Sequence, residues 1–92
     1  MKERKKERKG EHKMHNHEKI FFALCFRLSA SGIKPRAVVQ ILNDTIPHRR
    51  CWYYLRKWSN LGIYEYGVGM DLGWFIPAAQ MPARYREILE EK

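Results

Sequence analysis

The chain has 92 residues, 45% of them hydrophobic and 13% aromatic, which suffices for one small domain with a single modest core. Its 18 Lys and Arg against 10 Asp and Glu give a formal net charge of +8, which favours a polyanionic partner over basicity for solubility alone. No apolar run approaches the roughly 20 residues of a membrane span, and the basic start lacks the apolar centre of a secretory signal. Cys25 and Cys51 both lie among apolar residues, so we expect buried thiols and a cytoplasmic protein.

Residues 1–13 form a basic segment with seven cations, three Glu and no apolar residue after Met1. Such a segment buries too little apolar surface to offset the entropy lost on ordering, so we predict a mobile N-terminal arm. The folded domain is then expected over residues 14–92.

The first predicted helix begins at Asn16, a residue suited to the N-cap, and Gly32 closes it. Glu18 in the first turn suits the positive end of the helix dipole. Phe22 and Phe26 form one apolar row, so the helix is either central to the core or also packed against a second chain. A further apolar face at helical spacing consists of Phe21, Leu24, Cys25 and Leu28.

Two more helices are predicted next. Pro35 suits the first turn of a short amphipathic helix. A third helix is predicted over about residues 47–61, with Thr45 or Ile46 as its cap and Gly62 as its end. Its inward face consists of Cys51, Leu55 and Trp58, flanked by Tyr54 and Leu61.

After the third helix the apolar period changes to two, which predicts a β-hairpin. Its strands are expected at residues 63–66 and 72–76, with a loop over residues 67–71, and Pro77 ends the second strand. A closing helix is predicted over residues 82–91. The inward residues of this helix are Tyr85, Ile88 and Leu89. Together these elements predict a mainly α fold with a small β-hairpin.

This order of elements resembles that of winged helix-turn-helix domains. The residues that carry the resemblance are IPHRRCWYYLRKWSNLGIYEY at 46–66, which are similar to the recognition helix and first wing strand of small prokaryotic transcription regulators. The resemblance covers roughly residues 17–77 and implies a three-helix core, a two-stranded wing and a recognition helix at about 47–61. It implies a nucleoid-associated regulator that binds double-stranded DNA sequence-specifically.

Three interpretations compete for the third helix. In the first, Arg49, Arg50 and Tyr53 contact base edges, because Arg can bond guanine bidentately and Tyr can pack on sugar or a thymine methyl. In the second, the helix is the solvated face of a protein-binding module. In the third, Trp52 and Tyr53 contact another subunit. Under the first interpretation, the phosphate contacts are assigned to His48, Arg56, Lys57, Lys34, Arg36, Lys5, Lys6, Arg8 and Lys9.

The segment DLGWF at residues 71–75 carries a second resemblance. It is similar to the acidic-x-Gly-aromatic-aromatic wing of the archaeal counterpart of the general transcription factor TFIIE. This resemblance implies an alternative function, a protein-interaction module of a larger transcription or replication complex.

Two features depart from the regulator pattern. There is no Lys or Arg from Ser59 to Ala83, which leaves wing contact with DNA open, and Lys34 stands where Ser or Thr commonly caps the second helix.

Neither a metal site nor a catalytic centre is predicted. His12, His15 and His17 are close in sequence, but their spacing matches no structural zinc pattern. Glu65 and Asp71 have no His or nucleophilic Ser near them in sequence, and a Gly-rich phosphate loop is absent. We therefore expect no enzymatic activity and no cofactor.

The Phe22 row of the first helix needs its own cover, which the closing helix of the same chain or of a second copy can supply. We expect a homodimer, because many small winged regulators pair through terminal helices and a pair of recognition helices meets two half-sites about one DNA turn apart. The residues assigned to this interface are Phe22, Phe26, Tyr85, Ile88 and Leu89.

Overall fold

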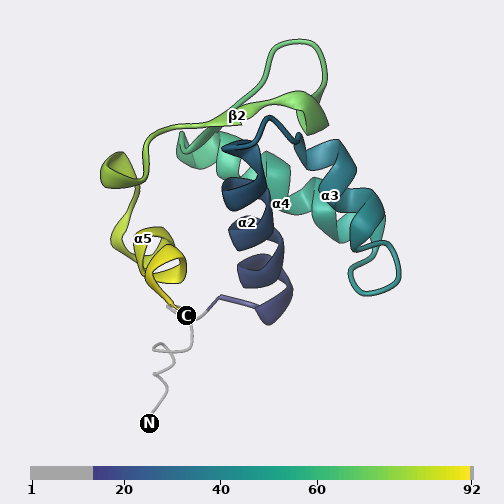
Figure 1. The fold of residues 1–92 in the computed structure, drawn as a ribbon, viewed down its shortest axis with the longest axis horizontal. Helices are drawn as coiled ribbons and strands as arrows, with labels where there is room; N and C mark the ends of the chain where they lie inside the picture. Colours follow the sequence, from purple (N-terminus) through teal and green to yellow (C-terminus); the bar gives the residue numbers. More distant parts are fainter. Residues whose placement is uncertain (1–13, 92) are drawn as a thin grey trace, which may run out of the picture.

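The computed structural model describes residues 14–91, which form four helices and a two-stranded antiparallel hairpin (Figure 1). The elements in chain order are α2 (Asn16–Ser29), α3 (Pro35–Ile41), α4 (His48–Leu61), β1 (Tyr64–Glu65), the single 3₁₀ turn η1 (Met70–Leu72), β2 (Trp74–Phe75), a second 3₁₀ turn η2 (Ala78–Gln80) and α5 (Ala83–Glu90). The predicted class, mainly α with a small β-hairpin, is confirmed. The predicted arm at residues 1–13 lies outside the described residues.

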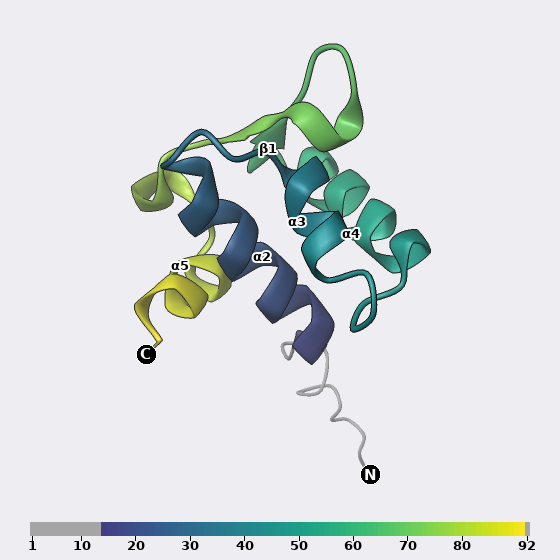
Figure 2. The same cartoon turned by 45° about the vertical axis from the view of Figure 1, so that its right-hand side comes forward.

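α2 lies between α5 on one side and α3 with α4 on the other, and the hairpin closes one end of this arrangement (Figure 2). The core forms where α2 meets α4. The fully buried ring of Trp58 lies 5.3 Å from the rings of both Phe21 and Phe22, measured between centroids. Phe75 from the hairpin packs against the same Trp58 ring at 5.8 Å, so one aromatic cluster joins the helices to the hairpin.

α2 begins with a cap that differs from the predicted one. His15 occupies the N-cap, and its Nδ1 accepts a hydrogen bond from the backbone N–H of His17 at 3.0 Å. The prediction that Asn16 caps this helix was wrong, because the imidazole one residue earlier already accepts from the first turn. At the other end Gly32 has a φ of 83°, the left-handed conformation expected at a helix end.

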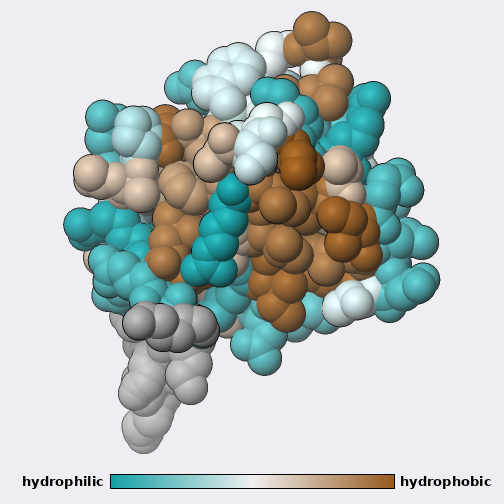
Figure 3. All heavy atoms as spheres, viewed as in Figure 1, coloured by the Kyte–Doolittle hydropathy of each residue, from teal (hydrophilic) through white to brown (hydrophobic). Residues whose placement is uncertain are grey.

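α2 is apolar on nearly every side, and it is turned differently from the prediction. Leu24 and Leu28, which the helical spacing placed on one apolar face with Phe21 and Cys25, are only partly buried, and Ile20 beside them is 42% exposed. Figure 3 shows apolar side chains gathered on the face over α2 and α3. The reason is that α5 covers one side of α2, α3 with α4 cover another, and a third side is left open. The fully buried residues of its apolar rows are Phe21, Phe22 and Cys25.

α3 and α4 are joined by a short connection in which Ile46 is fully buried. Ile46 therefore fills the core and does not cap α4. Pro47 occupies the N-cap position, and among the described residues no side chain caps this helix, so Thr45 does not serve as the predicted cap either. α4 ends at Gly62, whose φ is 83°, as predicted. The buried residues of α4 are Cys51, Tyr54, Leu55 and Trp58.

The hairpin has shorter strands than predicted: β1 covers only Tyr64 and Glu65, and Leu72 of the expected second strand belongs to η1. The cross-strand pairs are Tyr64 with Phe75 and Glu65 with Trp74. The Tyr64 hydroxyl donates to the Met70 carbonyl at 2.7 Å and accepts from the Gly73 N–H at 2.8 Å. This side chain replaces backbone hydrogen bonds that a longer strand pair would supply, and its burial raises the pKa of the Tyr64 hydroxyl.

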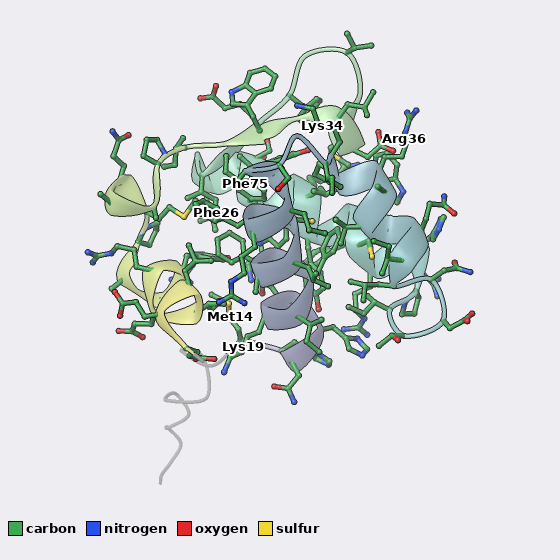
Figure 4. The ribbon with its side chains drawn as sticks, in the orientation of Figure 1. Met14, Lys19, Phe26, Lys34, Arg36 and Phe75 are labelled. Atoms are coloured by element: carbon green, nitrogen blue, oxygen red, sulfur yellow. The ribbon has the colours of Figure 1, made fainter. Side chains whose placement is uncertain are left out.

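The DLGWF segment is explained by local packing. Asp71 is 8% exposed and faces α3, and Phe75 packs on Phe26 of α2 with 5.6 Å between ring centroids (Figure 4). A Cβ at Gly73 would clash with the Glu65 carbonyl oxygen and lie 2.7 Å from the Tyr64 ring, so only glycine fits there. Trp74 points outward and is 48% exposed.

α5 covers the Phe22 row of α2, which consists of Phe22 and Phe26, within the same chain. The ring of Phe22 lies 5.0 Å from that of Tyr85, and both side chains are fully buried. Ile88 is only 4% exposed, while Phe26 and Leu89 are partly buried against the core. Phe22, Tyr85 and Ile88 are therefore not available to a second copy, and the predicted interface residues serve mainly as intrachain core. The homodimer itself remains a prediction.

Candidate nucleic-acid interface

α4 presents one row of exposed residues at i, i+3, i+4, i+7 and i+11 spacing. This row, which we call the α4 outer face, consists of Arg49, Trp52, Tyr53, Arg56 and Asn60. Tyr53 is 60% exposed and Trp52 is 36% exposed. On the opposite side Leu55 and Trp58 are fully buried, so the core holds the outer face in a fixed orientation. Guanidinium, amide and aromatic groups on a rigid helix can contact base edges and sugars.

Arg50 lies at the edge of the α4 outer face. Its Nη1 is 3.5 Å from the hydroxyl of Tyr54, which belongs to the buried side of the helix. Arg50, Arg49, Tyr53 and Pro47 line one shallow hollow at the start of α4. The structure therefore brings the three residues predicted to contact bases to one place.

The first turn of α4 carries cations and no acidic residue. His48, Arg49 and Arg50 are all exposed there. The N-terminus of a helix is the positive end of its dipole, so cations in the first turn repel it and lower the intrinsic stability of the helix. A polyanion at this end would relieve the repulsion. The charge distribution therefore favours contact with phosphate groups.

Lys57, also predicted as a phosphate ligand, forms an ion pair within the chain. Its Nζ lies 2.9 Å from Oε1 of Glu18, and the Lys57 side chain is only 32% exposed. A carboxylate of α2 thus holds this ammonium group at the border of the α4 outer face. The sequence offered no sign of the pair, because the two residues are 39 positions apart.

Glu18 is 1% exposed and accepts hydrogen bonds from three donors in the described part of the chain. Besides Lys57, the indole N–H of Trp58 donates to its Oε2 at 2.9 Å, and the hydroxyl of Tyr85 donates to the same oxygen at 2.8 Å. Burial and this bond to the carboxylate raise the pKa of the Tyr85 hydroxyl. The carboxylate, predicted only to favour the helix dipole, therefore joins α2, α4 and α5.

Lys34 and Arg36, also predicted as phosphate ligands, lie where the start of α3 meets the hairpin (Figure 4). Arg36 donates to both carboxylate oxygens of Asp71, at 2.9 and 3.4 Å, and its side chain remains 61% exposed. Lys34 Nζ lies 3.4 Å from the Gly73 carbonyl oxygen. Both cations therefore anchor the hairpin, and Arg36 still faces solvent at its base.

The other predicted phosphate ligands fall into two groups. His48 and Arg56 are exposed on α4 and can reach a polyanion. Lys5, Lys6, Arg8 and Lys9 lie outside the described residues. Trp52 and Asn60 share the α4 outer face but were not assigned to it, although their i+3 and i+11 spacing from Arg49 is visible in the sequence.

The hairpin presents apolar and aromatic surface without a cation of its own. Tyr66, Val68 and Trp74 are 43%, 101% and 48% exposed. Tyr66 and Trp74 line an open hollow together with Glu65, an exposed acid. This surface can pack against an apolar partner or a deoxyribose, but it cannot neutralise a phosphate.

Among residues 14–91 no group of three or more His, Cys, Asp and Glu side chains is arranged to hold a metal ion. His15 and His17 have ring centroids 4.8 Å apart, and His12 lies outside the described residues. In the same part of the chain, no helix is both long and apolar enough to cross a membrane.

Comparison with protein-family models, with curated proteins and with solved structures gives no match for this chain.

Proposed function

We propose that the protein is a winged helix-turn-helix transcription regulator that binds double-stranded DNA sequence-specifically in the cytoplasm, at the nucleoid. α3 and α4 are its helix-turn-helix, α4 is the recognition helix, and the hairpin is the wing. The observation that carries this proposal is the α4 outer face, a row of exposed Arg, aromatic and Asn side chains on a helix whose other side is fixed in the core.

In this function the start of α4 enters the major groove. Arg49 bonds a guanine bidentately, Tyr53 packs on a thymine methyl or a sugar, and Arg50 contacts a neighbouring base or phosphate from the edge of the outer face. His48 and Arg56 contact phosphates beside the groove, where the guanidinium of Arg56 supplies positive charge. The exposed guanidinium of Arg36, at the base of the hairpin, supplies a cation that the wing itself lacks.

A second candidate function is a protein-interaction module within a transcription or replication complex. The specific observation in its favour is the hairpin surface of Tyr66, Val68 and Trp74, which is exposed and carries no cation. A wing of this kind suits an apolar protein partner better than a phosphate backbone.

The experiment that tests the first function is selection of bound sequences from a random duplex pool, followed by titration of the enriched site. We expect enrichment of a defined consensus. Arg49→Ala should weaken binding to that site by about 1–3 kcal/mol and relax the preference at one position. Arg86→Ala, which removes an exposed Arg of α5, is the matched control and should leave the preference unchanged.

Two results would contradict the regulator function. The first is a pool without enrichment, and the second is an Arg49→Ala protein that keeps the full consensus. Either result would favour the second candidate function, the protein-interaction module. Under that function Trp74→Ala should abolish capture of the partner. The fold should stay intact, because Trp74 lies outside the core.

A further inference from the structure

The carboxylate of Glu18 is the one acidic group of α2 that contacts both α4 and α5 within residues 14–91. It lies in the first turn of α2, is 1% exposed, and bonds Lys57 and Trp58 of α4 and Tyr85 of α5 at 2.8–2.9 Å. Such a buried carboxylate is costly unless it is paired and hydrogen-bonded, so its partners are strongly constrained in position.

Lys57 gives this carboxylate its positive counter-charge among the described residues. Trp58 and Tyr85 are neutral donors that share Oε2, whereas Oε1 accepts from Lys57. If Lys57 turned away to a DNA phosphate, Glu18 would remain buried without a cation from residues 14–91. That loss opposes any gain at the phosphate, so the ammonium group is held in place.

Lys57 nevertheless lies four residues after Tyr53, at the border of the α4 outer face. From this position its flexible side chain would reach the phosphates beside the groove if the carboxylate did not hold it. Glu18 therefore has two effects on the same helix: it fixes the orientation of α4 against α2 and α5, and it removes one cation from the DNA contacts.

We propose that Glu18 is the positioning residue of the recognition helix and that Lys57 is its counter-ion, not a phosphate ligand. The proposal rests on the proposed DNA-binding function. The orientation that Glu18 imposes on α4 determines the sequence preference. Glu18 also limits non-specific affinity, because it keeps Lys57 away from the phosphates.

The test measures DNA affinity against salt concentration for the full chain and its variants. Each phosphate that a protein neutralises contributes about 0.9 to the slope of log affinity against log salt. Lys57→Met should leave the slope of the wild type unchanged. Arg56→Met, at the neighbouring exposed position, is the matched control and should lower the slope by about 0.9. An equal loss in Lys57→Met would overturn the proposal.

Glu18→Gln should change the salt slope in the opposite direction. It releases Lys57, so the slope should steepen by about 0.9, and the double variant Glu18→Gln with Lys57→Met should return to the wild-type slope. The ratio of affinities for preferred and random DNA should fall about tenfold in Glu18→Gln, because the polar contacts that add to the core in orienting α4 are weakened. General loss of folding would instead weaken both affinities and flatten the slope, and a wild-type slope in folded Glu18→Gln would count against the proposal.

A measurement without DNA separates this proposal from the proposed function. Tyr85→Phe and Lys57→Met, combined in a double-mutant cycle of urea unfolding, should be coupled through Glu18 by at least about threefold in the unfolding constant. The coupling should vanish in the Glu18→Gln background. Additive effects would refute the link between α4 and α5. If the coupling is intact but the wild-type protein binds no duplex at low salt, the DNA-binding function is refuted, together with the role of Glu18 in sequence preference. The link between α4 and α5 through Glu18 would still stand.

Discussion

The hydroxyl of Tyr64 links the two sides of the hairpin, because it donates to Met70 and accepts from Gly73. At Gly73 the chain passes so close to the Glu65 carbonyl and the Tyr64 ring that there is no space for a side chain. A tyrosine and a glycine nine residues apart thus determine the path of the loop, and neither residue alone indicates this in the sequence.

We predict that Gly73→Ala lowers the free energy of unfolding by about 1–3 kcal/mol, because the added methyl group must displace backbone atoms. Gly67→Ala is the control, since a Cβ at Gly67 meets nothing within 4 Å, and it should change stability by less than about 0.5 kcal/mol. Urea unfolding measures both values. Equal stabilities of the two variants would show that the close approach at Gly73 is relieved by small shifts of the loop.

Within a single element, α4 has two faces with different roles, a buried face and the α4 outer face. Its buried residues include Leu55 and Trp58, both fully inaccessible, and its outer face carries Arg49, Tyr53 and Arg56. The core side fixes the helix, and the outer side is free to contact a partner. The helical period in the sequence predicted the buried positions Cys51, Tyr54, Leu55 and Trp58 correctly, whereas Leu61, expected on the inward flank, is 41% exposed. Lys57 is held at the border by Glu18 of α2.

Adjacent residues of α4 should therefore differ sharply in their effect on stability. Leu55→Ala should reduce the free energy of unfolding by about 2–5 kcal/mol, as expected for truncation of a buried leucine. Arg56→Ala should change it by less than about 0.5 kcal/mol, because its side chain is exposed. Thermal or urea unfolding of both variants checks the orientation of α4, and a reversed order would mean that the outer face is wrongly assigned.

For the molecule as a whole, the net charge of +8 bears on binding to a partner, and the position of the Phe22 row bears on assembly. The charge favours long-range attraction of a polyanion, and residues 1–13 hold seven of the 18 Lys and Arg. The Phe row was expected to need either α5 or a second copy, and α5 supplies the cover within the chain.

If the protein binds DNA as proposed, removal of residues 1–13 should flatten the salt dependence of binding and weaken binding to all sequences alike, because cations of an extended basic segment neutralise phosphates and do not read bases. Gel-shift titrations over a range of salt concentrations measure the slope. Replacement of Lys5, Lys6, Arg8 and Lys9 by Gln keeps the length of the arm and should reproduce most of the effect. A truncated protein with the full slope would show that the arm does not contribute.

Phe22→Ala should lower the free energy of unfolding by about 3–5 kcal/mol, because the ring is fully buried among Trp58, Phe75 and Tyr85. Sedimentation at micromolar concentration should give the same mass for the folded variant as for the wild type, whether that is the 11.1 kDa monomer or a dimer. A change of mass with little loss of stability would instead place Phe22 at a subunit interface.

The sequence alone was sufficient for features that depend on neighbours along the chain. Helical periodicity, glycine stops at Gly32 and Gly62, and the change to a period of two determined four helices, a hairpin and the two faces of α4, because these patterns are local. The tertiary structure decided the contacts between distant residues. It paired Glu18 with Lys57, 39 residues away, directed Arg36 to Asp71, and used α5 to bury Phe22 within one chain. Such pairings depend on how the helices pack against one another, and the spacing of residues along the chain does not predict that packing.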